Sequence, residues 1–337
     1  MEPIIQLRNL SKRYGTFKAV DELNLDVYRG EIFGLLGPNG AGKTTSILMM
    51  LGLTDPYSGT ARVCGYDATK NPIAVKQKVG YMPDSVGFYN HMTALENLIY
   101  LGRLNNLDES TLKDRAKAVL NVVGLADSMD KKAGIFSRGM KQRLGLADVL
   151  IKNPEVIILD EPTLGIDPAG VKEFLSLIKT LSEQQGLTVL LSSHHLHHVQ
   201  QVCDRVGIFV GGKLLAQGDI ASLSANLFGK EGAVTTIKTA QLFEQPWPLE
   251  AEMGQWEAIT AICISGDTLE FTTQHDITPR IVKHLVEKGY GILQVSRKEY
   301  GLDEIYQKYF ESSFNENLNH GKSSGIFKRA FFGQNKK

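Results

Sequence analysis

The fold of this 337-residue chain is decided by one stretch, Gly37-Pro38-Asn39-Gly40-Ala41-Gly42-Lys43-Thr44-Thr45. It matches the phosphate-loop pattern G-x-x-x-x-G-K-[ST]. An apolar run at 32–36 predicts a buried strand before the loop, and an apolar run at 47–51 predicts a helix after it. A strand, a glycine-rich loop and a helix in this order point several backbone N–H groups at one anion. The sequence therefore predicts a site for the phosphates of a nucleotide.

The residues of this loop have distinct expected tasks. Gly37, Gly40 and Gly42 allow backbone angles and a close approach to phosphate that a side chain would prevent. Lys43 then reaches the β- and γ-phosphates as a point charge, and the Thr44 hydroxyl holds Mg²⁺. The remaining residues of the loop are expected to bind the same nucleotide: Pro38, Asn39, Ala41 and Thr45. The alternative, a chance glycine-rich turn, does not account for the flanking strand and helix.

A second segment supplies carboxylates. Residues 156–159 form a short, wholly apolar run, which suits a strand buried on both faces of a parallel sheet. Asp160 follows this run and suits the Mg²⁺ shell, while Glu161 suits a general base or a water-positioning group. The alternative is a strand followed by a solvated acidic turn. Together with the phosphate loop, the two carboxylates predict phosphoryl transfer from a nucleotide to water.

Bulk composition argues against several other classes of protein. The chain is 42% hydrophobic and 22% charged, and its formal net charge of zero gives no electrostatic case for nucleic acid as a partner. The cysteines, Cys64, Cys203 and Cys263, are far apart and predict neither a disulfide framework nor a metal knuckle. The start of the sequence lacks the pattern of a signal peptide, and no apolar run approaches the roughly 20 residues that span a bilayer. We therefore expect a cytoplasmic protein that reaches a membrane only through a partner.

Strands alternate with helices along the first two thirds of the chain, which predicts an α/β core. Leucine, isoleucine and valine at helical spacing predict helices at 96–103 and 112–123. Two apolar runs separated by a glycine pair predict a hairpin at 208–216. Further strands are expected at 4–7, 23–27, 156–159 and 189–191.

A change of composition near 226–230 predicts a domain boundary. We expect a nucleotide-binding domain over 1–228, with a helical part at 85–150. A small α+β accessory domain is expected over 229–313, and a flexible tail over 314–337. The basic and aromatic segment 327–332 of this tail either touches a membrane or a partner, or belongs to a disordered end.

The accessory domain has a simple predicted order of elements. A strand is expected at 268–273 and a second strand at 291–295. Between them, residues 278–288 predict a helix that ends at Gly289, a residue well suited to a C-terminal cap.

At this point the chain resembles a known family, the ATP-binding cassette (ABC) ATPases, from residue 4 to residue 223. The resemblance implies a P-loop cassette: a RecA-like mixed-sheet core, an antiparallel β subdomain and a helical signature subdomain. It places Tyr14 against adenine and makes His194 the switch histidine that contacts the γ-phosphate. It also matches Gly165-Ile166-Asp167 to the loop that links the two nucleotide sites of a dimer.

The signature segment of the family matches Phe136-Ser137-Arg138-Gly139-Met140-Lys141-Gln142-Arg143. Because this segment begins a helix, its N–H groups and the Ser137 hydroxyl can face a γ-phosphate, as can the backbone at Gly139. In the family they do so on the nucleotide that the other subunit holds.

Two positions depart from the usual pattern of the family. Arg138 stands where the signature has the first of two glycines, and its guanidinium could reach phosphate or simply solvent. Asp84, at the end of residues 80–84, stands where the family usually has glutamine. An ionised Asp84 could still bind Mg²⁺ but could not donate a hydrogen bond. In the family this loop also senses the membrane partner.

A group of histidines permits a different hypothesis. On a helix, His194, His197 and His198 share a face, which allows a metal site. The resemblance instead assigns His194 to the γ-phosphate and places His195, His197 and His198 at a polar, solvated helix start.

The resemblance implies partners as well as cofactors. One cassette holds half of each ATP site, so a second cassette is required, and we expect a homodimer with ATP and Mg²⁺. A separate multi-span permease is expected to hold the protein at the inner face of the cell membrane. Residues 301–310 resemble the ending of exporter-type subunits, as in drug, polysaccharide and copper-enzyme maturation systems. Residues 80–89 and the signature variant resemble the subunit that serves copper-site assembly of nitrous oxide reductase.

The expected function is therefore a Mg-dependent, transport-coupled ATPase, the motor subunit of an exporter. One alternative is an ATP-binding regulatory cassette with weak hydrolysis. The other is a soluble ABC-type ATPase that is not coupled to transport. The chromosome-maintenance type would need a long coiled coil between phosphate loop and signature, and the translation-factor type a second phosphate loop; neither pattern occurs in the sequence.

Overall fold

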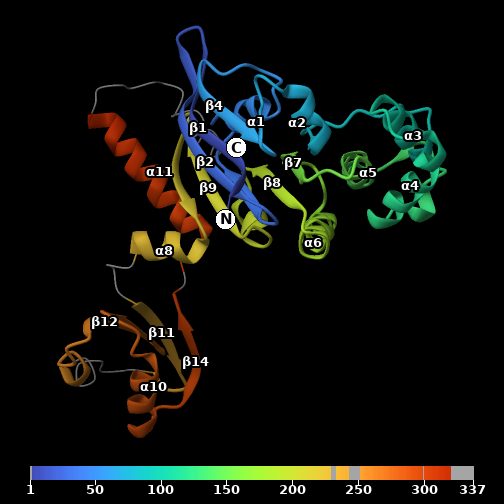
Figure 1. Ribbon diagram of the computed structural model, residues 1–337. Coiled ribbons are helices and arrows are strands. Elements are labelled where there is room, and N and C mark those ends of the chain that lie inside the picture. Colours follow the sequence, from blue (N-terminus) through green and yellow to red (C-terminus); the bar gives the residue numbers. More distant parts are fainter. Residues whose placement is uncertain (1, 229–232, 243–250, 299, 320–337) are drawn as a thin grey trace, which may run out of the picture. The chain divides into compact units, whose positions relative to one another are not determined.

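The computed structural model describes residues 2–228, 233–242, 251–298 and 300–319, with the backbone alone described at 311–319 (Figure 1). The chain divides into two compact units, Met1–Asp219 and Ile220–Lys337. The division falls just before helix α8 (Ile220–Phe228), whereas the composition break in the sequence lies near the end of that helix. Each unit has its own sheets and its own core.

The centre of the first unit is a six-stranded sheet in the order β10-β9-β3-β8-β7-β6. All of its strands are parallel except β10, which pairs antiparallel with β9 in the predicted hairpin. The strands are β3 (Ile32–Leu36), β6 (Val79–Met82), β7 (Val156–Asp160), β8 (Thr188–Ser193), β9 (Arg205–Val210) and β10 (Lys213–Gly218). β3 and β7 are buried at every position, which confirms the interpretation of their apolar runs. Because the carboxyl ends of parallel strands share one edge of a sheet, the loops after β3, β6, β7 and β8 converge there.

A second, antiparallel sheet has the order β2-β1-β4-β5. Its strands are β1 (Pro3–Tyr14), β2 (Phe17–Tyr28), β4 (Ser58–Val63) and β5 (Tyr66–Asp67). β1 and β2 are each 12 residues long, so they extend well beyond the short runs 4–7 and 23–27. Register shifts along the β1–β2 pair interrupt the strict alternation on which the sequence prediction relied.

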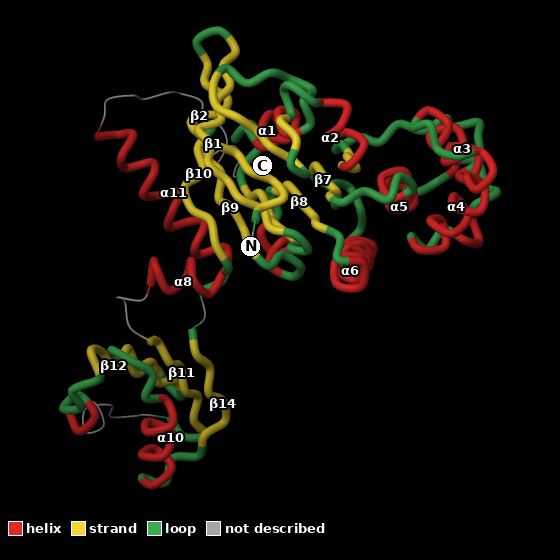
Figure 2. The backbone as a smooth tube through the Cα atoms, in the orientation of Figure 1, coloured by secondary structure: helices red, strands yellow, loops and turns green. Residues whose placement is uncertain are grey.

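Helix α1 (Lys43–Met50) lies in the core that both sheets of the first unit share (Figure 2). Its buried Ile47 and Met50 belong to one apolar cluster with Leu7 of β1 and Phe33 of β3. The phosphate loop therefore has a packed strand behind it and a packed helix after it, which fixes the positions of its ends.

The predicted helical part consists of α3 (Ala94–Leu104), α4 (Glu109–Val122) and α5 (Arg138–Leu150), which pack on one another (Figure 1). α3 begins with a capping box, in which the Thr93 hydroxyl accepts from the Glu96 N–H and the Glu96 carboxylate accepts from the Thr93 N–H. The remaining helices of this unit are α2 (Pro72–Lys78), α6 (Pro168–Gln185) and α7 (Leu196–Gln200). α5 starts at Arg138, so the signature segment begins a helix, as predicted.

The second unit contains an antiparallel sheet in the order β12-β13-β11-β14. Its elements are α8, β11 (Ala233–Thr239), β12 (Ile259–Ser265), β13 (Thr268–Thr273), α10 (Thr278–Glu287), β14 (Ile292–Arg297) and α11 (Leu302–Asn319). The predicted strand at 268–273, the helix before Gly289 and the last strand are present; the sequence prediction missed β11 and β12. α11 continues to Asn319, and the basic and aromatic segment 327–332 lies outside the described residues.

Across the described residues, no helix combines the length and the apolar character that crossing a bilayer requires.

Candidate nucleotide site

The phosphate loop is packed so closely that two of its glycines have no room for a side chain. A Cβ atom on Gly37 would lie 2.1 Å from the carbonyl oxygen of Phe209, and a Cβ on Gly42 would lie 2.3 Å from that of Ala19. Gly42 also has a φ of 109° and is the N-cap residue of α1. No side chain of the described residues caps this helix, so its first N–H groups face the loop. This is the arrangement that binds an anion.

Lys43 is buried, and its ammonium group lies among oxygen atoms. Its Nζ atom donates to the carbonyl oxygen of Gly37 at 2.7 Å and to that of Pro38 at 3.3 Å. The same Nζ lies 3.2 Å from Oε1 of Glu161. The lysine therefore brings a positive charge to the point where the phosphate loop meets the carboxyl end of β7.

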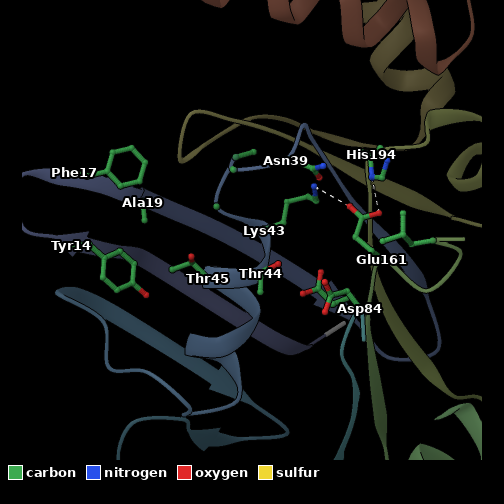
Figure 3. A pocket seen from close by; sticks show the side chains of 15 residues that line it. Tyr14, Phe17, Ala19, Asn39, Lys43, Thr44, Thr45, Asp84, Glu161 and His194 are labelled. Carbon is green, nitrogen blue, oxygen red and sulfur yellow. Dashed lines mark hydrogen bonds and ion pairs between the residues drawn. The ribbon is translucent and has the colours of Figure 1, made fainter. Parts of the chain in front are cut away.

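Glu161 lies between Lys43 and His194, as Figure 3 shows. The Nδ1 atom of His194 is 2.8 Å from Oε2 of Glu161. The Glu161 N–H donates to the Ser192 carbonyl at 3.2 Å and to the Ser192 hydroxyl at 3.1 Å. Glu161 has a φ of 50°, an unusual angle for a residue with a side chain. Its Oε1 is buried and accepts no hydrogen bond from the described residues, and the Lys43 ammonium is its charged partner.

Asp160 is buried beside Ser192, whose hydroxyl donates to Asp160 Oδ1. The two residues are register partners in the parallel pair β7–β8. Sequence reasoning did not assign Ser192 a role. The available signal was its place at the end of an apolar run, but the pairing of β7 with β8 was needed to bring it to Asp160.

These residues surround a hollow of about 470 Å³, whose lining includes most of the predicted site. Tyr14 and Phe17 line one end and are both more than half exposed, so a flat ring can stack on them. The predicted lining residues are Tyr14, Asn39, Gly40, Ala41, Gly42, Lys43, Thr44, Thr45, Asp84, Asp160, Glu161 and His194, and the lining residues that the sequence did not single out are Phe17, Ala19 and Leu164. Gly37 and Pro38 are not in the lining and take part through their carbonyl groups on Lys43.

The residues present fit a magnesium ion. Thr44, Asp84 and Asp160 line the same hollow and offer oxygen ligands, which this cation prefers. Burial, and then the negative charges of Asp160 and Asp84, raise the pKa of Tyr81 to about 12. The smaller part of that rise comes from the two carboxylates at the carboxyl ends of β6 and β7, whose negative charge a divalent cation would offset.

Comparison with known proteins identifies the family. A family model described as ABC transporter matches residues 20–164. The bacitracin transport ATP-binding protein BcrA of Bacillus licheniformis is 44% identical over 319 residues, which cover 91% of this chain and 97% of BcrA. The chain belongs to the ABC transporter ATP-binding proteins. The linearmycin resistance ATP-binding protein LnrL of Bacillus subtilis (strain 168) is 40% identical over 226 residues, or 67% of this chain and 72% of LnrL.

A solved structure supports the same fold for this ABC ATP-binding protein. The structure of cbiO1 from Clostridium perfringens, part of the ABC transporter complex cbiONQ, matches with a TM-score of 0.60 and 28% sequence identity. It covers 65% of this chain and 89% of cbiO1. The predictions of the family, of the cassette fold and of a transport ATPase are therefore confirmed.

The signature segment of this ABC protein is separate from the hollow in its own chain. Ser137 is the N-cap residue of α5, and its hydroxyl accepts from the Met140 N–H at 3.3 Å. Neither Ser137 nor Gly139 lines the hollow. Arg138 is exposed to solvent, and its Nε also donates to the carbonyl oxygen of Leu164 at 2.6 Å, a contact that the sequence did not predict.

Three histidine rings that follow β8 lie next to one another. The ring centroids of His194 and His195 are 4.0 Å apart, and those of His195 and His198 are 5.1 Å apart. Burial and the neighbouring histidines hold the pKa of His195 and of His198 below the ordinary value. His198 Nδ1 lies 3.3 Å from the Thr163 hydroxyl. Within the described part of the chain, no group of three or more metal-binding side chains is arranged around a common point.

Proposed function

We propose that this protein is the motor subunit of an exporter for an antibiotic, and that it works as a pair of identical cassettes closing on two ATP molecules. The observation that carries the proposal is the extent of the match to BcrA, which covers 91% of this chain. BcrA is named for bacitracin transport. A match of that extent includes much of the second unit as well as the nucleotide motifs. LnrL, which is named for linearmycin resistance, points to the same class of cargo.

The chemistry we propose is assigned residue by residue. The phosphate loop and Lys43 bind the β- and γ-phosphates, and Tyr14 stacks on adenine together with Phe17. Glu161 accepts a proton from the attacking water, and His194 holds the Glu161 carboxylate in place. Thr44, Asp160 and Asp84 hold Mg²⁺, which supplies charge neutralisation of the phosphates when bound. The Ser192 hydroxyl orients Asp160.

A second copy is proposed because one chain leaves the signature helix without a nucleotide. Ser137 and Gly139 stand at the N-terminus of α5, outside the hollow of their own chain. A helix N-terminus carries partial positive charge and suits a γ-phosphate. Two antiparallel copies would place each signature segment on the nucleotide of the other copy.

The membrane partner is proposed to be a separate multi-span permease, which holds the pair at the inner face of the cell membrane. In a bacitracin-sensitive host, we expect the chain co-expressed with a multi-span permease subunit to raise the tolerated bacitracin concentration several-fold. The Glu161→Gln variant, expressed to the same level, is expected to give no protection. Equal sensitivity of hosts with the parent and with the variant would contradict bacitracin-type cargo.

A cassette with weak hydrolysis remains the second candidate, and Asp84 is the observation that favours it. The carboxyl group of Asp84 lines the hollow where the family usually has an amide that can donate a hydrogen bond. The Asp84→Gln variant separates the two candidates. A rise in kcat of tenfold or more over the parent would favour the regulatory cassette; an unchanged or lower kcat would favour the motor.

A further inference from the structure

One side chain joins the start of the signature helix to the loop that follows the proposed base. Arg138 is the first residue of α5, and its Nε–H donates to the Leu164 carbonyl oxygen at 2.6 Å. Leu164 in turn donates its own N–H to the Glu161 carbonyl oxygen at 3.1 Å. Two consecutive hydrogen bonds therefore lead from α5 to the backbone of Glu161.

The packing around this contact shows that the arginine lies against the loop. A Cβ atom on Gly165 would be 2.7 Å from Arg138 Nε and 2.8 Å from its Cδ. Gly165 has a φ of 73°, which favours glycine independently of the space. On the neighbouring residue, a Cβ on Gly139 would be 3.6 Å from Cγ2 of Ile166. The turn 163–167 and the first turn of α5 therefore pack closely. Arg138 extends from α5 onto the turn, and each of the two segments contributes a glycine, Gly139 and Gly165, at the contact.

A second arginine of α5 contacts the next helix but not the catalytic loop. Arg143 donates through Nη2 to Oε2 of Glu173 in α6, at 2.8 Å, and through Nη1 to the Val123 carbonyl oxygen at the end of α4, at 3.0 Å. These contacts hold the helices together. Of the two arginines, only Arg138 reaches the turn that begins at Glu161.

We propose that Arg138 is a positioning residue for ATP hydrolysis. Its Nε–H holds the Leu164 carbonyl and thereby fixes the turn that sets the direction of the Glu161 carboxylate. The contact also couples the orientation of the signature helix to the base within a single chain. The role belongs to the Nε–H donor and not to the positive charge. This inference rests on the proposed role of Glu161.

Two neutral substitutions separate the donor from the charge. In Arg138→Gln, the Nε2 amide stands as many bonds from Cα as the Nε of arginine, so a donor remains. In Arg138→Met, a methyl group occupies the same place. We expect kcat for Mg-ATP hydrolysis to stay within about twofold of the parent in Arg138→Gln and to fall about five- to tenfold in Arg138→Met. The KM for ATP should remain unchanged in both variants, because the contact does not touch the nucleotide.

Three other results would overturn the inference. An equal fall of kcat in both variants would assign the effect to the charge, and an unchanged kcat in both would leave Arg138 without a role. A rise in KM with kcat preserved would assign Arg138 to nucleotide binding. Lys117→Met is the matched control, since it removes one exposed positive charge from α4, outside the signature segment, and we expect it to hydrolyse ATP like the parent. Circular dichroism melting of each variant shows whether the fold is intact.

Failure of this inference is distinguishable from failure of the proposed function. The parent must hydrolyse ATP and Glu161→Gln must not; a parent without activity would refute the motor function and this inference together. If the parent, Arg138→Gln and Arg138→Met hydrolyse ATP at the same rate and Glu161→Gln does not hydrolyse it, only the proposed role of Arg138 is refuted.

Discussion

The Nδ1 atom of His194 lies 2.8 Å from Oε2 of Glu161. The other carboxylate oxygen of Glu161 faces Lys43. A carboxylate held on both sides cannot rotate freely, so the direction in which it accepts a proton is set before any water arrives. Glu161 is buried and held at both oxygens, which does not fit the solvated acidic turn that the sequence alone left open.

Removing the imidazole should therefore impair the chemical step. For His194→Ala we expect a fall in kcat of about 100-fold, with ATP affinity preserved within a few-fold, because the base would lose its orientation. His197→Ala is the matched control, since His197 is within hydrogen-bond distance of Gln201 and does not line the hollow. A kcat for His194→Ala within twofold of the parent would show that His194 does not hold the base.

The buried ion pair between Lys43 and Glu161 should contribute measurably to the free energy of unfolding. Lys43→Met leaves a buried carboxylate with one charged neighbour fewer, and we expect it to lower the free energy of unfolding by about 2–3 kcal/mol. The double variant Lys43→Met/Glu161→Gln should lose less than the sum of the single variants, with a coupling of about 1–2 kcal/mol. Both tryptophans, Trp247 and Trp256, lie in the second unit, so circular dichroism is the suitable probe. If the stability losses of the two single variants add strictly in the double variant, Lys43 and Glu161 do not stabilise each other.

Two glycines of the phosphate loop should respond differently to alanine. At Gly40, which has a φ of 80° and nothing within 4 Å of the place that a methyl group would take, alanine should cost about 1 kcal/mol of backbone strain. At Gly42 the methyl would also meet Ala19 and Phe209, so we expect loss of ATP binding and a stability loss of several kcal/mol. Titration with a fluorescent ATP analogue and thermal melting measure the two effects. Equal ATP affinity and equal melting temperature in the two variants would contradict the close packing around Gly42.

Stability should depend on pH through Asp148 of α5. Burial raises the pKa of Asp148 to about 6 from an ordinary value of 3.8, although the nearby Lys152 partly opposes the rise. The native state then retains a proton that the unfolded state releases, so stability falls as the pH rises from about 4 to 6. Asp148→Asn should remove this dependence and stabilise the protein at pH 7 by about 3 kcal/mol. Urea unfolding at pH 4.5 and pH 7 checks it, with the exposed Asp114→Asn as a control that should show no difference from the parent.

The order of the core elements could be predicted because each signal was local. A phosphate loop between two apolar runs, and an apolar run before Asp160, identify strands and helices from a few neighbouring residues. The ends of β1 and β2 could not be found in this way, because the register shifts between them disrupt the alternation. β11 and β12 were missed because their positions depend on pairing with β13, which the sequence does not display.

The candidate site followed the same division between local and tertiary information. Lys43, Asp160 and Glu161 stand in local motifs that indicate their chemical roles. Ser192 could not be assigned, because its contact with Asp160 exists only through the β7–β8 register. The hydrogen-bond partner of Arg138 lies 26 residues away on a different loop, so no local pattern in the sequence could predict this contact.

The most direct test concerns Glu161 and the second copy together. We would measure the mass of the Glu161→Gln variant by light scattering, with and without Mg-ATP, beside the ATPase rate of the parent. A monomer that becomes a stable dimer with ATP, a hydrolysing parent and an inactive variant are the predicted results. A variant that binds ATP yet stays monomeric would contradict the composite site, and a variant that hydrolyses at the parental rate would contradict the role of Glu161.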